Sequence, residues 1–134
     1  MIDRIQRLAA AIGATGCYFL CLVYLGERES GAPVDALHAF RAALLARYVR
    51  DDCYIDYPEH IMEMIAGGGW AVEKRPADAP TAPGELEILR YDNAGASHFV
   101  VGDGAGGIAF DPYGDSKTVR EGKLVSKRIF TRTI

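Results

Sequence analysis

The hydrophobic pattern of this chain changes its period along the sequence, and that change limits the fold more than any other feature. In the first part of the chain, apolar residues recur in steps of three and four, which indicates amphipathic helices. In the last third, short runs rich in Val, Ile and Phe alternate with Gly, Asp and Asn, which is typical of strands. The pattern predicts an α+β fold, with N-terminal helices packed on a C-terminal antiparallel sheet.

Four stretches carry the helical pattern, at about residues 2–12, 17–25, 33–50 and 58–64. The second stretch, Cys17 to Leu25, is apolar on all sides, so we expect it to be buried and to end at Gly26. Its Tyr, Phe and Val residues would also suit a central strand. Pro33 fits the first position of the third helix, because its missing N–H group is not needed there.

Five runs are expected to be strands, at residues 70–73, 86–91, 97–103, 107–111 and 124–130. We expect consecutive strands to pair with one another. A connection rich in Pro and Ala, over residues 75–85, separates the helical part from the strand-rich part. Neither part is expected to bury an adequate core alone, so residues 1–134 are predicted to form a single domain.

Composition excludes several classes of function. The 15 basic and 18 acidic residues give a net charge of -3 and are interspersed, which does not favour a nucleic-acid partner. The longest apolar run is far shorter than the roughly 20 residues of a membrane span. The N-terminus does not resemble a secretory signal, so we expect a cytoplasmic protein. The 3 cysteines suit neither a disulfide framework nor a zinc site, and we expect no metal and no cofactor.

One cysteine has the position of a nucleophile. Cys17 follows Gly16 and opens the apolar helix, where the helix dipole favours a thiolate. Together with an imidazolium neighbour, such a position can lower a cysteine pKa from about 8.5 into the range of roughly 3.5 to 7.5. Cys21, one helical turn further on, and Cys53 are expected to be core residues instead.

A histidine and an aspartate are expected to lie together on the sheet. If a tight turn centres on Gly104 and Ala105, His98 pairs directly with Asp111 and their Cβ atoms lie about 5 Å apart. Together with Cys17 they supply a nucleophile, a base and an orienting carboxylate. The opposite face of the hairpin is then expected to be the core face, with Phe99, Val101, Ile108 and Phe110.

The order of these motifs resembles that of the papain-like cysteine peptidases, most of all the bacteriocin-processing type and its stand-alone relatives. The chain is also similar to small uncharacterised proteins of phages, prophages and plasmids. Four segments carry this likeness: Gly16-Cys17-Tyr18-Phe19, Asp52-Cys53-Tyr54-Ile55, His98-Phe99-Val100 and Asp111 to Ser116. The likeness covers most of the chain. It implies a papain-like fold, with Cys17 as nucleophile, His98 as general base and acid, and Asp111 orienting the imidazole.

The chain departs from the papain-like pattern at one position. The related peptidases have a Gln about six residues before the nucleophile, which donates to the oxyanion, and Ala11 stands there in this chain. Gln6 is the only other candidate side chain, and it would serve only if a local insertion brought it back. Otherwise the backbone N–H groups near Cys17 must stabilise the oxyanion.

Three interpretations follow. In the first, the protein is a cysteine peptidase or amidase that acts on a peptide, an isopeptide or a peptidoglycan cross-bridge through a thioester acyl-enzyme. In the second, motivated by Ala11, it is a catalytically inactive papain-like interaction module of a phage or another mobile element. In the third, Cys17 is only a core residue.

Overall fold

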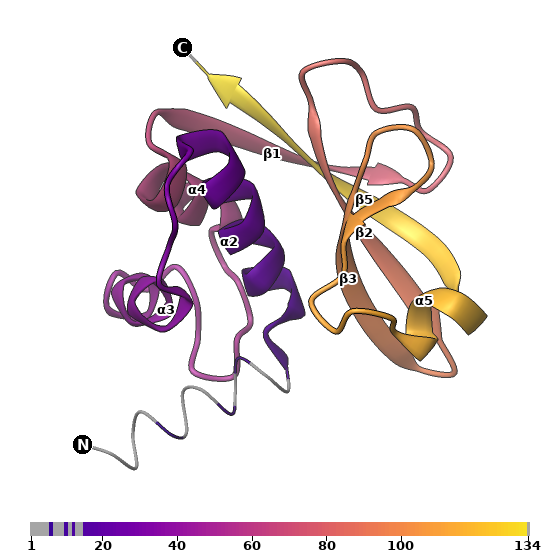
Figure 1. The fold of residues 1–134 in the computed structure, drawn as a ribbon, viewed down its shortest axis with the longest axis horizontal. Helices are drawn as coiled ribbons and strands as arrows, with labels where there is room; N and C mark the ends of the chain where they lie inside the picture. Colours follow the sequence, from indigo (N-terminus) through magenta and orange to yellow (C-terminus); the bar gives the residue numbers. More distant parts are fainter. Residues whose placement is uncertain (1–5, 7–9, 11, 13–14, 134) are drawn as a thin grey trace. The chain divides into compact units, whose positions relative to one another are not determined.

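The computed structural model describes residues 6, 10, 12 and 15–133. These residues form two compact units, one ending at Gly67 and the other beginning at Gly68. The first unit is helical and the second contains a five-stranded antiparallel sheet, which confirms the predicted α+β class (Figure 1). The helical part therefore ends at Gly67 and not in the connection over residues 75–85, because the first strand precedes that connection.

Three helices of the first unit are α2 (Cys17–Ser30), α3 (Ala36–Leu45) and α4 (Pro58–Ala66). The prediction that Gly26 ends α2 is wrong. Gly26 lies inside the helix, where a Cβ atom would overlap the Ile65 side chain of α4, so this glycine allows the two helices to approach closely. The helix ends at Gly31, whose φ of 72° is the left-handed conformation typical of a C-terminal cap.

The boundaries of α3 also differ from the prediction. The helix does not begin at Pro33, because the carboxylate of Asp35 accepts a hydrogen bond from the His38 N–H group and caps the helix there. It ends at Leu45 and not at residue 50, and the chain turns at Arg47, whose φ is positive. The helix expected over residues 2–12 lies mostly outside the described residues, of which Gln6, Ala10 and Ile12 are helical.

The apolar run that begins α2 is largely buried, but not on all sides as expected, since Tyr18, Leu20 and Tyr24 are only half-buried. Phe19, Cys21, Leu22 and Leu25 are fully buried, and the Phe19 ring meets Phe40 of α3 edge to face at 5.2 Å. This burial favours a helix from residues that would also suit a strand, since a helix that is largely covered by its neighbours needs little polar surface. Among the described residues, no helix has both the length and the apolar character needed to cross a bilayer.

All five predicted strands are present, as β1 (Gly69–Pro76), β2 (Leu86–Asn93), β3 (Ala96–Gly102), β4 (Ile108–Phe110) and β5 (Lys123–Thr133). Their order in the sheet is β1-β5-β2-β3-β4. The expectation that consecutive strands pair is therefore wrong for β1 and β2 and for β4 and β5, because β5 lies between β1 and β2 and pairs with both.

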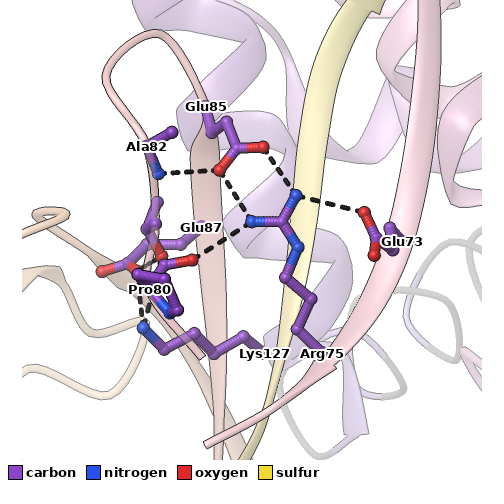
Figure 2. A network of polar contacts seen from close by, with 8 residues as sticks. Glu73, Arg75, Pro80, Ala82, Glu85, Glu87 and Lys127 are labelled. Atoms are coloured by element: carbon purple, nitrogen blue, oxygen red, sulfur yellow. Dashed lines mark hydrogen bonds and ion pairs between the residues drawn. The ribbon is translucent and has the colours of Figure 1, made fainter. Parts of the chain in front are cut away.

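The connection between β1 and β2 is held by a network around one guanidinium group (Figure 2). Arg75 donates to both carboxylate oxygens of Glu85, at 2.7 and 2.6 Å, to Glu73 at 3.1 Å and to the Pro80 carbonyl at 3.2 Å. The Arg75 bonds and the N–H group of Ala82 lower the pKa of Glu85 to about 2. The connection is thus fastened to β1.

A buried carboxylate joins this connection to the loop after β3. Glu87 accepts hydrogen bonds from the Thr81 hydroxyl at 2.6 Å and from the Gly104 N–H group at 2.9 Å, and Lys127 lies 3.5 Å away. A Cβ atom at Gly102 would overlap the same carboxylate, so a glycine is required beside it. Glu87 therefore positions the loop that leads into β4.

Candidate functional site

The candidate base lies on a central part of the sheet. His98 is on β3, opposite Tyr91 of β2, and its side chain is only 2% exposed. A buried imidazole needs hydrogen-bond partners. The Nε2 atom of His98 lies 2.7 Å from Oδ1 of Asp111, so the structure brings together the second and third residues of the predicted triad.

Asp111 follows β4 directly and is held by the loop that it begins. Its carboxylate accepts hydrogen bonds from the backbone N–H groups of Tyr113 at 2.9 Å and Ser116 at 3.2 Å, in addition to the contact with His98. Burial by itself raises the pKa of Asp111, but the bonds from His98, Tyr113 and Ser116 outweigh it, and the pKa lies below its ordinary value. The group is therefore an ionised carboxylate at neutral pH.

The charge of Asp111 determines which nitrogen of the neutral imidazole carries the proton. An ionised carboxylate only accepts hydrogen bonds, so Nε2 of His98 is the donor in their 2.7 Å contact. In the neutral ring the basic nitrogen is then Nδ1. This is the division of roles that an imidazole needs in order to accept a proton from a nucleophile.

The pair forms through a different register from the predicted one. Phe110 pairs with Val101, where the predicted turn would have paired it with Phe99. At Phe110 the displacement is two residues, which keeps Phe110 and Asp111 on their predicted faces because the side-chain period of a strand is two. Asp111 consequently still reaches His98, along a diagonal of the ladder. Toward the loop a bulge between Val101 and Gly102 changes the register, and Gly102 pairs with Ile108.

The loop after β3 explains the changed register. It is not a tight turn on Gly104 and Ala105, but a wider loop closed by a hydrogen bond from the Asp103 N–H group to the Gly107 carbonyl. The Asp103 carboxylate accepts bonds from the N–H groups of Ala105 and Gly107, at 2.8 and 2.9 Å. These bonds lower the pKa of Asp103.

The predicted core face of this hairpin is only partly correct. Val101 is fully buried, but Ile108 is 40% exposed, while Phe99 and Phe110 are half-buried. The side chains of His98 and Val100, on the other face, are fully enclosed.

The hydrophobic pattern of the sequence did not predict α5 (Lys117–Glu121). This short helix follows the loop after Asp111 and packs against β2, β3 and β5.

Two residues of this site were missed by the sequence analysis. The ring of Tyr113 stacks on the His98 imidazole, with centroids 4.5 Å apart and planes at 15°, while 48% of the residue remains exposed. Ser116 caps α5 with its side chain and donates its N–H group to Asp111. The signal was the segment Asp111 to Ser116, whose Asp-Pro start and Ser end are typical of a turn followed by a helix cap.

Cys17 is the first residue of α2, as the sequence predicts, and it is 8% exposed. Gly16 precedes it, and a Cβ atom there would overlap the backbone of Ile12, so only glycine fits. Cys17 belongs to the helical unit and His98 to the sheet unit. The convergence of Cys17 with the His98–Asp111 pair stays a prediction.

The other two cysteines are buried, as the sequence analysis predicts, and none of the three forms a disulfide. Cys21 is fully enclosed in α2. Cys53 has a positive φ of 70° in a turn that follows α3. Within the described ranges, no group of three or more His, Cys, Asp or Glu residues is arranged to hold a metal ion.

The position of the missing glutamine, Ala11, lies outside the described residues. Gln6 is exposed. The assignment of Gln6 as an oxyanion donor thus stays a prediction, and the start of α2 is the remaining source of donors.

Comparison with known proteins places the chain in a family without assigning an activity. The model of the family described as "Protein of unknown function, DUF261" matches residues 2–132, so the chain belongs to that family. No curated protein and no solved structure matches the chain.

Proposed function

We propose that this member of the DUF261 family is a cysteine hydrolase that cleaves an amide bond through a thioester acyl-enzyme. The observation that carries the proposal is the buried His98–Asp111 pair, in which a carboxylate with a lowered pKa holds Nε2 of the imidazole. A structural histidine needs only a hydrogen-bond partner. An ionised partner that fixes the tautomer is what a general base needs.

In the proposed reaction, Nδ1 of His98 takes the proton of the Cys17 thiol, and the thiolate attacks the carbonyl carbon of the substrate. The C–N bond then breaks as His98 returns the proton to the leaving amine. A water molecule, deprotonated by His98, attacks the thioester and releases the acid and the Cys17 thiol. Asp111 stabilises the imidazolium in each half of the reaction.

The oxyanion is assigned to the backbone at the start of α2. Cys17 is the first residue of this helix, so the first backbone N–H groups of the helix include its own. Such groups, at the positive end of the helix dipole, can donate to an oxyanion beside Cys17. The substrate class is a peptide, an isopeptide or a peptidoglycan cross-bridge, and an acyl acceptor other than water would make the protein a transferase.

The test is selective alkylation of the folded protein with iodoacetamide at pH 6, followed by peptide mass spectrometry. We expect Cys17 to be labelled at least about tenfold faster than Cys21 and Cys53, because a paired thiolate persists below the ordinary thiol pKa. The control is the same protein unfolded in urea, in which the three thiols should react at similar rates. Equal or slower labelling of Cys17 in the folded protein contradicts the proposal.

The competing candidate is a catalytically inactive interaction module, and Ala11 in place of the glutamine favours it. In that case Cys17→Ala leaves the biological effect of the protein intact, whereas substitutions among the basic residues of β5 abolish it. Loss of the effect in Cys17→Ala, with the fold retained by circular dichroism, supports the hydrolase instead.

A further inference from the structure

A hydrogen bond fastens the start of α2 to a turn that lies far away in the sequence. The hydroxyl of Thr15 donates to the carbonyl oxygen of Asp52 at 2.9 Å. Cys17 lies two residues after the first partner and Cys53 one residue after the second. Both cysteines belong to the helical unit, neither forms a disulfide, and they are only 8% and 5% exposed.

Cys53 occupies an unusual backbone conformation. The turn is closed by hydrogen bonds from the Cys53 N–H group to the Arg50 carbonyl and from the Arg50 N–H group to the Tyr54 carbonyl, each at 2.9 Å. The φ of Cys53 is 70°, in the left-handed region where glycine and asparagine are favoured. Glycine can therefore replace Cys53 without strain in the backbone.

The two thiols also interact electrostatically. Burial raises the pKa of Cys53, a hydrogen bond with Thr15 lowers it, and the negative charges of Asp52 and of a Cys17 thiolate raise it further. The two cysteines are therefore near enough for the charge of one to affect the pKa of the other.

We propose that Cys17 and Cys53 are a peroxide-sensitive dithiol that closes to a reversible disulfide. The Thr15–Asp52 bond holds the two segments together for this reaction. Because the disulfide consumes the Cys17 thiol, it switches off the hydrolase, and this consequence rests on the proposed function.

The reaction balances with hydrogen peroxide as the oxidant. The Cys17 thiolate attacks one peroxide oxygen, the O–O bond breaks, and the products are a Cys17 sulfenic acid and hydroxide. The Cys53 sulfur then attacks the sulfenic sulfur, the S–O bond breaks, and the hydroxyl group leaves as water with the Cys53 proton. Two thiols and one peroxide thus give one disulfide and two water molecules.

The test treats the full chain with a small excess of hydrogen peroxide, removes the peroxide with catalase and blocks the remaining thiols with N-ethylmaleimide. Intact-mass and non-reducing peptide analysis should show a loss of about 2 Da and a link between the peptides that contain Cys17 and Cys53. One thiol, Cys21, should stay available. In a parallel sample, dithiothreitol added before the N-ethylmaleimide step should return the number of reactive thiols to three.

Matched variants test the partner assignment. Cys21→Ser should form the same disulfide. Cys53→Ser should instead accumulate sulfinic acid at Cys17, which dithiothreitol does not reverse. If the serine variant fails to fold, Cys53→Gly suits the left-handed backbone and should give the same result.

Three outcomes overturn the proposal: a link that involves Cys21, a wild-type Cys17 that is oxidised to sulfinic acid beside a free Cys53, or no oxidation at all. Each is separable from failure of the hydrolase. Selective alkylation of Cys17 without formation of the disulfide contradicts only the dithiol proposal. A Cys17–Cys53 disulfide in a protein that shows no selective alkylation at pH 6 contradicts only the hydrolase proposal.

Discussion

The start of α2 and the loop after β4 each carry part of the predicted triad, and different interactions hold them. At the start of α2, close packing of Gly16 against the backbone of Ile12 holds the segment that carries Cys17, together with the Thr15–Asp52 hydrogen bond. In the loop after β4, directional hydrogen bonds from backbone groups and from His98 of β3 hold Asp111. Substitution of Gly16 should therefore act mainly on stability, and substitutions of His98 and Asp111 mainly on chemistry.

The largest effect is expected from His98→Ala, which removes the proposed base. Alkylation of Cys17 at pH 6 should slow by about 10²-fold or more, in the range that general-base groups contribute. The matched control is His38→Ala, because His38 is exposed on α3 and belongs to neither region. An unchanged rate in His98→Ala would mean that the two regions do not act together.

Asp111→Asn should have the next largest effect on alkylation, a slowing of roughly tenfold to a hundredfold, because the amide cannot stabilise the imidazolium. It should also change the acid stability. The pKa of Asp111 is lowered in the fold, so its contribution is complete above about pH 4 to 5 and is lost as the pH falls through the lowered value.

Urea unfolding between pH 2 and pH 7 measures this difference. The wild-type free energy of unfolding should fall more steeply at acid pH than that of Asp111→Asn. The control is Asp115→Asn, which alters an exposed carboxylate that pairs with Arg120. Parallel pH profiles for wild type and Asp111→Asn would contradict the assignment of an ionised, hydrogen-bonded carboxylate.

Gly16→Ala tests the packed region. Its φ is -92°, so the added methyl group costs energy only through the overlap with Ile12, and we expect a loss of about 1–3 kcal/mol in the free energy of unfolding. Gly31→Asn is the control, since open space surrounds Gly31 and asparagine tolerates its positive φ. Equal stabilities of the two variants would show that close packing does not hold the start of α2.

The smallest effect is expected at Tyr113, whose ring covers the imidazole. Tyr113→Ala should slow Cys17 alkylation about twofold to tenfold, in line with the energy of an aromatic pair. Tyr113→Phe keeps the stacked ring and should react like the wild type. A large effect in Tyr113→Phe would show that the hydroxyl, and not the stacking, matters.

The hydrophobic period predicted the class of every long element because burial dominates there. It failed where one specific contact decides a boundary. Gly26 does not end α2 but makes room for Ile65 of α4. The carboxylate of Asp35 caps α3 and so sets its start, although Pro33 favours the first position of a helix. Neither contact changes the apolar pattern of its segment.

The candidate site was predictable in its residues more than in its geometry. Side chains alternate between the two faces of a strand, which placed His98 and Asp111 on one face. A displacement of two residues does not change the face on which a side chain lies. The register itself depends on the Asp103 hydrogen bonds, which the Gly-rich loop does not reveal. The contacts of Tyr113 with His98 and of Ser116 with Asp111 were not predicted. They precede α5, and this helix of five residues is too short to show a hydrophobic period.

The position of β5 between β1 and β2 has a consequence for the time course of folding. The β2–β3 and β3–β4 pairs join neighbouring segments, so loop closure is inexpensive and they can assemble early. Among the strands that the structure describes, β1 pairs only with β5, and it must await the arrival of a segment that follows all the others. Until then β1 is an unpaired strand and β2 is an open edge of the nascent sheet, so both are exposed to association with other chains.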